Sequence, residues 1–180
     1  AREQQMAEDY KTTRELLDNL IYASQEQELI FTELGKLKEY GPRFVKLNTE
    51  QMKVREKCAL LEDSLRMLAK RQPMVSTFIT QEINRINTNM DDALGHLKER
   101  NIRMASVEEQ YVMTGLNNLA VMLMESMQDM QAQMNKGKGK GKGKAQGKGQ
   151  GEGEGQGSGG KKGGEGNGKL SEGQKQLGEM

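Results

Sequence analysis

The chain has few of the residues that build sheets, disulfide frameworks and catalytic centres. It contains no tryptophan, one cysteine, one histidine and two prolines, and aromatic residues make up 4% of it. The single cysteine excludes an internal disulfide, and Cys58 falls in an apolar register that predicts a small buried side chain. Valine, isoleucine and threonine do not alternate with polar residues over a useful length, so the sequence does not predict strands.

Long apolar runs and the common catalytic motifs are also missing. No apolar run of about 18 residues and no signal peptide occurs, so this segment is not expected to cross a membrane. No glycine-rich phosphate loop opens a helix after a strand, and no nucleophile motif surrounds the serines, Cys58 or His96. Asp92 and His96 share a helical face, but a zinc or iron site would need ligands from a partner. We therefore expect no enzyme, no metal and no cofactor.

The abundant residues are Leu, Met, Glu, Gln and Lys, which are strong helix formers. The longest apolar stripe lies in residues 111–134, where steps of three and four residues place the apolar side chains on one helical face. Ser106-Val-Glu-Glu109 fits a capping box that would begin this helix. The stripe consists of Val112, Leu116, Leu119, Leu123, Met127, Met130 and Met134.

Three earlier segments show the same spacing, at about residues 4–39, 44–71 and 73–97. Gly41-Pro42 separates the first from the second, Pro73 can open the third, and a polar stretch at 98–103 follows it. Their stripes consist of Leu16, Leu20, Ala23, Gln27, Ile30, Leu34 and Leu37; of Leu47, Gln51, Val54, Cys58, Leu61, Leu65, Leu68 and Gln72; and of Ile79, Ile83, Ile86, Met90, Leu94 and Leu97.

Short connections between helices favour antiparallel neighbours. We therefore predict an all-α fold over residues 1–134, an antiparallel bundle of about four long helices. Coiled-coil hairpins that dock on other parts of a longer chain, or on a second copy, are the alternative. A continuous helix through residues 98–103 also stays open.

Three residues interrupt the apolar stripes. Gln27 and Gln51 occupy positions where heptads usually carry apolar residues, and from inside the core they could fix register or oligomeric state. We instead expect them at the stripe edges, where their amides would reach water. Gly115 could let another backbone approach closely, or it could be a weak point that costs about 1 kcal/mol relative to alanine.

Residues 135–180 differ from the rest in composition. They contain 18 of the 22 glycines, together with ten lysines and five glutamates. Glycine at alternate positions prevents the burial of surface, so we predict a disordered linker at 135–169. Leu170, Leu177 and Met180 predict the start of a truncated helix at 170–180, as expected for a piece of a longer protein.

The lysines of this tract offer a second kind of partner. They could attract nucleic acid or anionic lipid through counterion release. No arginine or aromatic residue accompanies them, so base stacking is absent and nucleic acid is not the expected partner. The candidate polyanion contacts are Lys136, Lys138, Lys140, Lys142, Lys144 and Lys148.

The methionines of the last predicted helix allow a metal-binding alternative. Met127, Met130 and Met134 would place three thioethers on one face, and thioethers bind Cu(I). The same positions continue the leucine stripe, which favours packing or a pliable docking surface instead.

Several stretches share residues and spacing with one known family: Tyr111-Val-Met-Thr, Asn117-Asn-Leu-Ala120, Leu123, Glu125, Met130, Met134, Gln81 to Met90 with the Leu94–Leu97 turn, Glu62 to Leu65, Leu68 to Arg71, and the Gly/Gln/Lys-rich tract. In these stretches the chain resembles a domain-of-unknown-function family of very large envelope proteins of Bacteroidota. The resemblance implies membrane helices near the N terminus of the parent and a helical, low-complexity C-terminal half that includes this segment, on the periplasmic side of the inner membrane. It implies no catalytic residue.

These features predict a non-enzymatic scaffold or protein-interaction segment that acts by helix packing. Its expected partner is a protein, another region of the parent chain or a second copy. Polyanion binding through residues 136–148 is the alternative. The candidate interaction surface consists of Leu116, Leu119, Leu123, Met127, Met130 and Met134.

Overall fold

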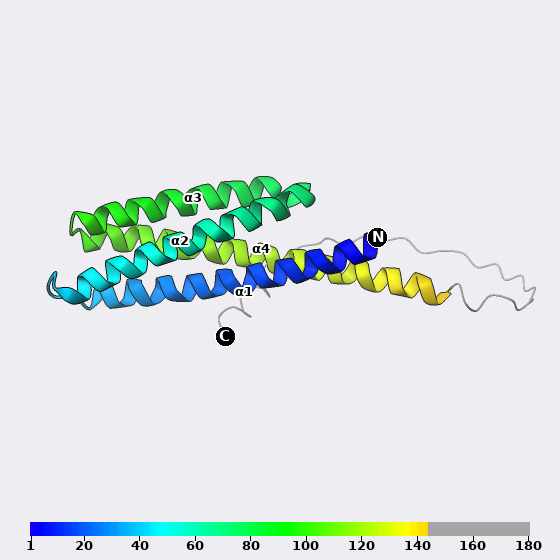
Figure 1. The fold of residues 1–180 in the computed structure, drawn as a ribbon, viewed down its shortest axis with the longest axis horizontal. Coiled ribbons are helices and arrows are strands. Elements are labelled where there is room, and N and C mark those ends of the chain that lie inside the picture. Colours follow the sequence, from blue (N-terminus) through cyan, green and yellow to red (C-terminus); the bar gives the residue numbers. More distant parts are fainter. Residues whose placement is uncertain (144–180) are drawn as a thin grey trace, which may run out of the picture. The chain divides into compact units, whose positions relative to one another are not determined.

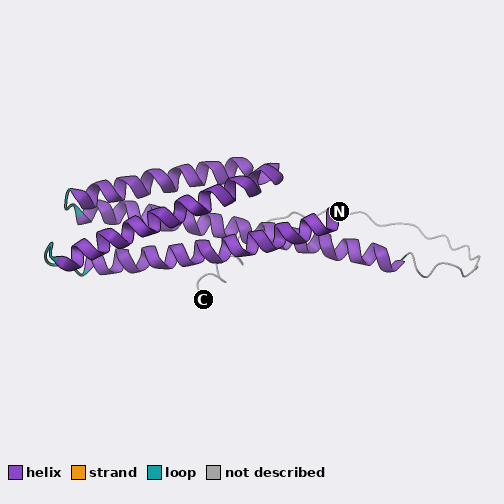
Figure 2. Ribbon diagram, in the orientation of Figure 1, coloured by secondary structure: helices purple, strands orange, loops and turns teal. Residues whose placement is uncertain are grey.

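The computed structural model describes residues 1–143, apart from the side chains of 73–75 and 139–143. That part of the chain contains four helices and no strand, so the predicted all-α fold is confirmed. None of the described helices combines the length and apolar character that a membrane crossing requires. The helices are α1 (Arg2–Gly35), α2 (Pro42–Arg71), α3 (Pro73–Lys98) and α4 (Ile102–Gly143) (Figures 1 and 2).

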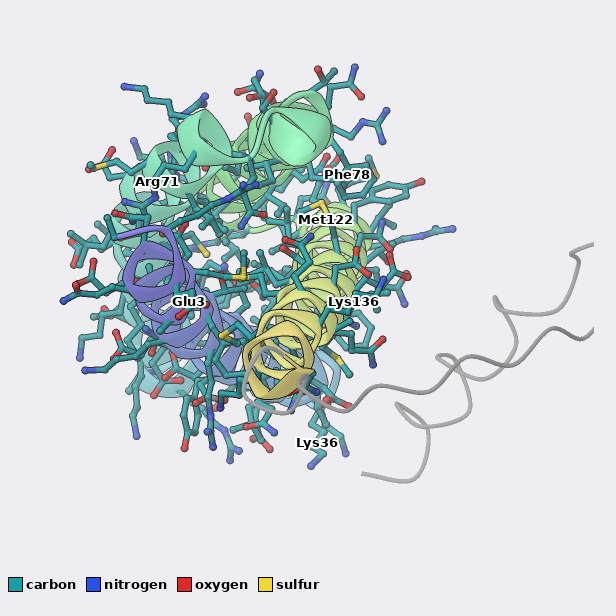
Figure 3. All side chains as sticks on the ribbon, turned by 90° about the vertical axis from the view of Figure 1, so that its right-hand side faces the viewer. Glu3, Lys36, Arg71, Phe78, Met122 and Lys136 are labelled. Atoms are coloured by element: carbon teal, nitrogen blue, oxygen red, sulfur yellow. The ribbon has the colours of Figure 1, made fainter. Side chains whose placement is uncertain are left out.

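Residues Ala1–Asn135 form one compact bundle in which each helix runs antiparallel to the next. The loops between α1 and α2 and between α3 and α4 lie at the same end of this bundle (Figure 2). Seen along the helices, side chains from all four fill the space between them (Figure 3). The hydrogen bonds that link neighbouring helices include Gln27 with Gln51, Arg55 with Asp91, and Ser24 with Asn117.

The four apolar stripes meet in a single core, as the helical spacing predicts. Nearly all of the stripe residues are buried, and burial of each Leu or Ile side chain stabilises the fold by roughly 1.5–3 kcal/mol. On α3 the inner position next to Leu94 is taken by Ala93, which is 0% exposed. The stripe residues that are only partly buried are Leu37, Gln72, Leu94, Met127 and Met134.

The first helix ends earlier than the sequence predicts. α1 stops at Gly35, where the Lys36 and Leu37 amides bond to the carbonyls of Glu33 and Leu34 at 3.2 Å and tighten the last turn. Glycine is a poor helix former, so the chain leaves the helix there. α2 then begins at Pro42, whose missing amide costs nothing in the first turn.

The junction between α3 and α4 is a break, and its cap is not the predicted one. Arg100 adopts a left-handed φ of 58°, and the Asn101 amide bonds to the His96 carbonyl at 2.8 Å, which closes α3 as a Schellman motif. Asn101 then caps α4, because its Oδ1 accepts from the Met104 amide at 3.2 Å. The Ser106–Glu109 capping box is therefore wrong, since both residues lie inside α4.

The expectation that Gln27 and Gln51 reach water is also wrong. Both side chains are 0% exposed. Their amides exchange two hydrogen bonds of 2.8 and 2.7 Å between α1 and α2, and Gln51 Nε2 also donates to Met90 Sδ at 2.9 Å. A reciprocal pair satisfies the polar groups that burial would otherwise leave without partners, so the core accepts them.

Gly115 lies at a close helix contact. A Cβ placed there would be 2.6 Å from Ile86 Cγ1, which no real packing allows. The group that approaches closely is the Ile86 side chain and not a backbone, and the contact joins α4 to α3.

α4 continues past Met134 to Gly143, into the tract for which the composition predicts disorder. The remainder of the predicted linker and the predicted helix at 170–180 lie outside the described residues.

Candidate interaction surface

The residues predicted to form an interaction surface on α4 mostly face the interior of the bundle. Leu116, Leu119, Leu123 and Met130 are buried against the other helices of the same chain. Met127 and Met134 are partly exposed. In this conformation the α4 stripe is therefore part of the core rather than a free docking face.

The predicted polyanion contacts are only partly described. Lys136 and Lys138 are exposed on α4, and residues 140 and 142 belong to the same helix without described side chains. Lys144 and Lys148 lie outside the described residues. Residues two apart in a helix point about 200° away from each other. Alternate lysines on a helix therefore do not form a single continuous line.

Exposed apolar side chains occur on all four helices, including Phe78 of α3 and Tyr111 of α4, and several of them lie on the face made by α1 and α2. Tyr22 and Leu29 of α1 are each 65% exposed, and Leu60 of α2 is 72% exposed. Met67 follows Leu60 at heptad spacing and is 61% exposed. We name the depression between these two helices the α1–α2 groove; Tyr22, Leu29 and Leu60 lie along it.

An ion pair divides the α1–α2 groove into two hollows. Lys57 of α2 donates to Glu26 of α1, and both residues line both hollows. Tyr22 and Leu60 line one hollow, and Leu29 lines the other with Lys53. The floor of each hollow is apolar, and its rim carries charges of both signs. This combination suits an amphipathic helix that buries an apolar edge and keeps its charges at the rim.

A polar network links the outer faces of α2 and α3. Glu62 accepts from Asn87 at 2.7 Å and from Arg66 at 2.8 Å, and Arg55 donates to Asp91 at 2.9 Å. Burial alone would raise the pKa of Glu62, but these hydrogen bonds and the charges of Arg66 and Arg55 outweigh burial and lower that pKa. The network fixes α3 on α2 and offers no nucleophile or metal ligand set.

Glu109 is an unexpected feature of the core. Its side chain is 0% exposed, and neither carboxyl oxygen has a hydrogen-bond partner among the described residues. Burial raises the pKa of Glu109 to about 8. By contrast, the nearly buried Glu82 of α3 accepts from Arg85 at 3.2 Å.

The remaining candidate residues occupy structural positions. Cys58 is buried as predicted, and burial raises the pKa of its thiol to about 11, with small opposing effects of Arg55 and Glu26. Met130 Sδ lies 4.0 Å from Gln72 Nε2, at the junction of α2 and α3. Across the described part of the chain, no three His, Cys, Asp or Glu residues are grouped as a metal site would require.

No protein-family model matches this chain, and no curated protein or solved structure matches it either. Function is therefore inferred from the geometry of the bundle.

Sequence reasoning missed the α1–α2 groove and Glu109. The groove had a visible signal, because Tyr22 and Leu29, like Leu60 and Met67, are seven residues apart and lie off the main stripes. Glu109 also lies three residues before Val112, in line with the α4 stripe. Because Glu109 also fits a capping box, the sequence predicted a helix start there and not a core position.

Proposed function

We propose that this chain is a non-enzymatic helical interaction segment, and that its docking site is the α1–α2 groove. The observation that carries the proposal is that Tyr22, Leu29 and Leu60 lie exposed along one depression between α1 and α2. Single exposed apolar residues are normal on protein surfaces, whereas adjacent ones in a groove mark a binding site.

The free energies of side-chain burial and of association indicate how much of the groove a partner must cover. Burying one of these side chains contributes roughly 1–2 kcal/mol, whereas association costs about 4–15 kcal/mol in lost freedom. Several of them must therefore be buried together, which a helix lying along both hollows achieves and a small molecule in one hollow does not. The partner that fits is an amphipathic helix of another protein, of the parent chain or of a second copy.

Site-specific photo-crosslinking in the producing cells tests this proposal. A photoreactive amino acid at position 60 should give discrete adducts, because Leu60 lies in the α1–α2 groove. The same probe at position 81, an exposed residue of α3, should give none. Leu29→Lys should abolish the adducts, since a charge in the hollow opposes apolar docking. An adduct of twice the chain mass would identify a second copy as the partner.

Equal adducts at positions 60 and 81, or none at position 60, would contradict the proposal. So would adduct formation that Leu29→Lys leaves unchanged.

The alternative proposal is polyanion binding by the lysines that begin at Lys136. The exposed Lys136 and Lys138 support it. Binding to single-stranded DNA or to anionic vesicles should then weaken steeply with added salt. Replacing the six candidate lysines by glutamine should abolish it, and binding that survives this replacement rules the alternative out.

The cellular location belongs to the same set of proposals. We place the segment in the cell envelope, on the periplasmic side of an inner-membrane-anchored parent, and the family resemblance is the support for this placement. Accessibility of an epitope tag after permeabilising only the outer membrane tests it, and accessibility only after lysis of the inner membrane refutes it.

A further inference from the structure

The buried Glu109 does more than fill space in the core. A carboxyl group that is 0% exposed and lacks a donor on either oxygen is rare, because enclosing a charge without a partner is strongly unfavourable. Glu109 is in line with Ala105, Val112 and Leu116, which are all buried on the inner face of α4. Its position is therefore set by the packing of α4 against the other helices.

The antiparallel register shows what lies level with Glu109 on each neighbouring helix. Hydrogen bonds from Ser24 to Asn117 and from Tyr40 to the Arg100 carbonyl align α4 with α1. The Gly115–Ile86 contact aligns α4 with α3, and the Gln27–Gln51 pair aligns α1 with α2. The core residues at this level are Ile30 and Leu34 of α1, Leu47 of α2, and Met90 and Ala93 of α3, all buried.

The charged groups at the same level lie toward the surface and have other partners or stay in solvent. Glu33 of α1 pairs with Arg43, and Asp91 of α3 pairs with Arg55. Lys46 and Glu50 of α2 pair with each other at 3.9 Å. The other titratable residues within one turn of this level are the exposed Glu28 of α1, the exposed Asp92 and the partly buried His96 of α3, and the partly buried Glu108 of α4 itself. Apart from the buried Asn48 Oδ1 of α2, the layer at the level of Glu109 is apolar, with no counter-charge described inside it.

We propose that Glu109 is a proton-binding site in the core of the bundle, and that closure of α4 onto α1 and α3 is coupled to uptake of that proton. The neutral acid is compatible with the apolar layer. Once ionised, the carboxylate requires water or a cation, and it obtains either one only when α4 moves away. Loss of the proton therefore loosens the first turns of α4, around residues 105–116.

The direction of the pH effect follows from the two states of the chain. The unfolded chain releases this proton near the ordinary pKa of 4.5, whereas burial holds the pKa of Glu109 in the bundle at about 8. Between these values the unfolded state binds fewer protons, so stability falls as the pH rises. The stabilising contribution is complete below pH 4.5 and is lost by about pH 8.

Chemical denaturation of the full chain at a series of pH values from about 5 to about 9 tests this proposal. The matched variants are Glu109→Gln, which keeps the shape without the proton, and Glu56→Gln, which removes an exposed glutamate of α2. Relative to Glu109→Gln, the unfolding constant of the natural chain should increase by up to tenfold per pH unit below the core pKa. Glu56→Gln should follow the natural chain.

Hydrogen exchange supplies a local readout of the same event. At about pH 8, amides of residues 105–116 should exchange faster in the natural chain than in Glu109→Gln, because ionisation opens this part of α4. If Glu109→Gln does not fold, Glu109→Leu serves as the pH-independent reference. Parallel pH profiles for the natural chain and the reference, or a carboxyl titration of Glu109 near its ordinary value by carbon NMR, would overturn the proposal.

Discussion

At the scale of single residues, the buried amide pair sets the register of the first two helices. Gln27 and Gln51 are hydrogen-bonded only to each other and to Met90 Sδ in the core. Sliding α1 by one turn along α2 would leave both amides without partners, at a cost of about 1–3 kcal/mol for each. The pair therefore favours one alignment over its neighbours, which an all-leucine seam would not do.

Replacing one member of this pair should destabilise the bundle more than replacing both. Gln51→Leu leaves Gln27 buried and without its main partner, so the free energy of unfolding should fall by about 2–3 kcal/mol. The double variant Gln27→Leu with Gln51→Leu should recover part of that loss, because no amide remains buried. Urea denaturation of both single variants and the double variant measures the coupling. Additive losses would contradict the pairing.

Gly115 and Gly95 form a matched pair of helical glycines with opposite surroundings. A Cβ at Gly115 would collide with Ile86, whereas a Cβ at Gly95 meets nothing within 4 Å. Gly115→Ala should therefore cost about 1–3 kcal/mol through overpacking, whereas Gly95→Ala should gain up to about 1 kcal/mol in helix propensity. Thermal melting of both variants shows whether each substitution lowers or raises stability. The loss at Gly115 should shrink in the Ile86→Ala background; equal effects at both glycines would be inconsistent with the close contact.

At the scale of elements, the loop between α3 and α4 contacts the loop between α1 and α2 at one end of the bundle. The Tyr40 hydroxyl donates to the Arg100 carbonyl at 2.7 Å, and the Arg100 guanidinium lies 5.7 Å from the centre of the Tyr40 ring. Phe44 meets the same ring edge to face at 5.0 Å. These contacts hold Arg100 in the left-handed conformation that a glycine would otherwise be expected to provide.

The start of α4 can be tested directly. Asn101→Ala removes the cap and should cost about 1 kcal/mol. Ser106→Ala lies inside the helix and should change stability by less than about 0.5 kcal/mol. Denaturation midpoints of the two variants distinguish the caps. A larger loss at Ser106 would restore the capping box that the sequence pattern indicated.

At the scale of the whole molecule, the apolar stripes of the four helices pack into one shared core. α4 contributes buried residues from Ala105 to Met130, and it contacts α1 through Asn117 and α3 through Gly115. The other helices of this chain cover the inner face of α4, whereas Met104, Val107 and Tyr111 stay exposed on its outer face.

Cys58 reports opening of the whole bundle, because it is the single cysteine of the chain. Burial raises the pKa of its thiol from 9.0 to about 11, which lowers the reactive thiolate fraction about a hundredfold near neutral pH. Alkylation of the folded chain should be slower than in urea by at least this factor. The rate should rise in Gly115→Ala in step with its loss of stability. Equal rates in folded and unfolded chains would refute the closed core.

The sequence by itself determined that residues 1–134 form four helices, about where each helix lies, and which apolar side chains face inward. Those properties follow from local spacing and helix propensity, since steps of three and four residues place apolar groups on one face in any context. The stripes of α1 and α2 followed the spacing so closely that even Cys58 was placed correctly.

Only the tertiary structure decided whether the polar residues within and beside the stripes are buried or exposed. Whether Gln27 reaches water, whether Glu109 caps a helix or is buried, and whether the α4 stripe stays free depend on which faces meet across the bundle. Those contacts join residues far apart in sequence, as in the bond from Ser24 to Asn117. Local periodicity carries no information about such pairings. Periodicity predicted the helices, but the α1–α2 groove exists only because α1 and α2 pack side by side.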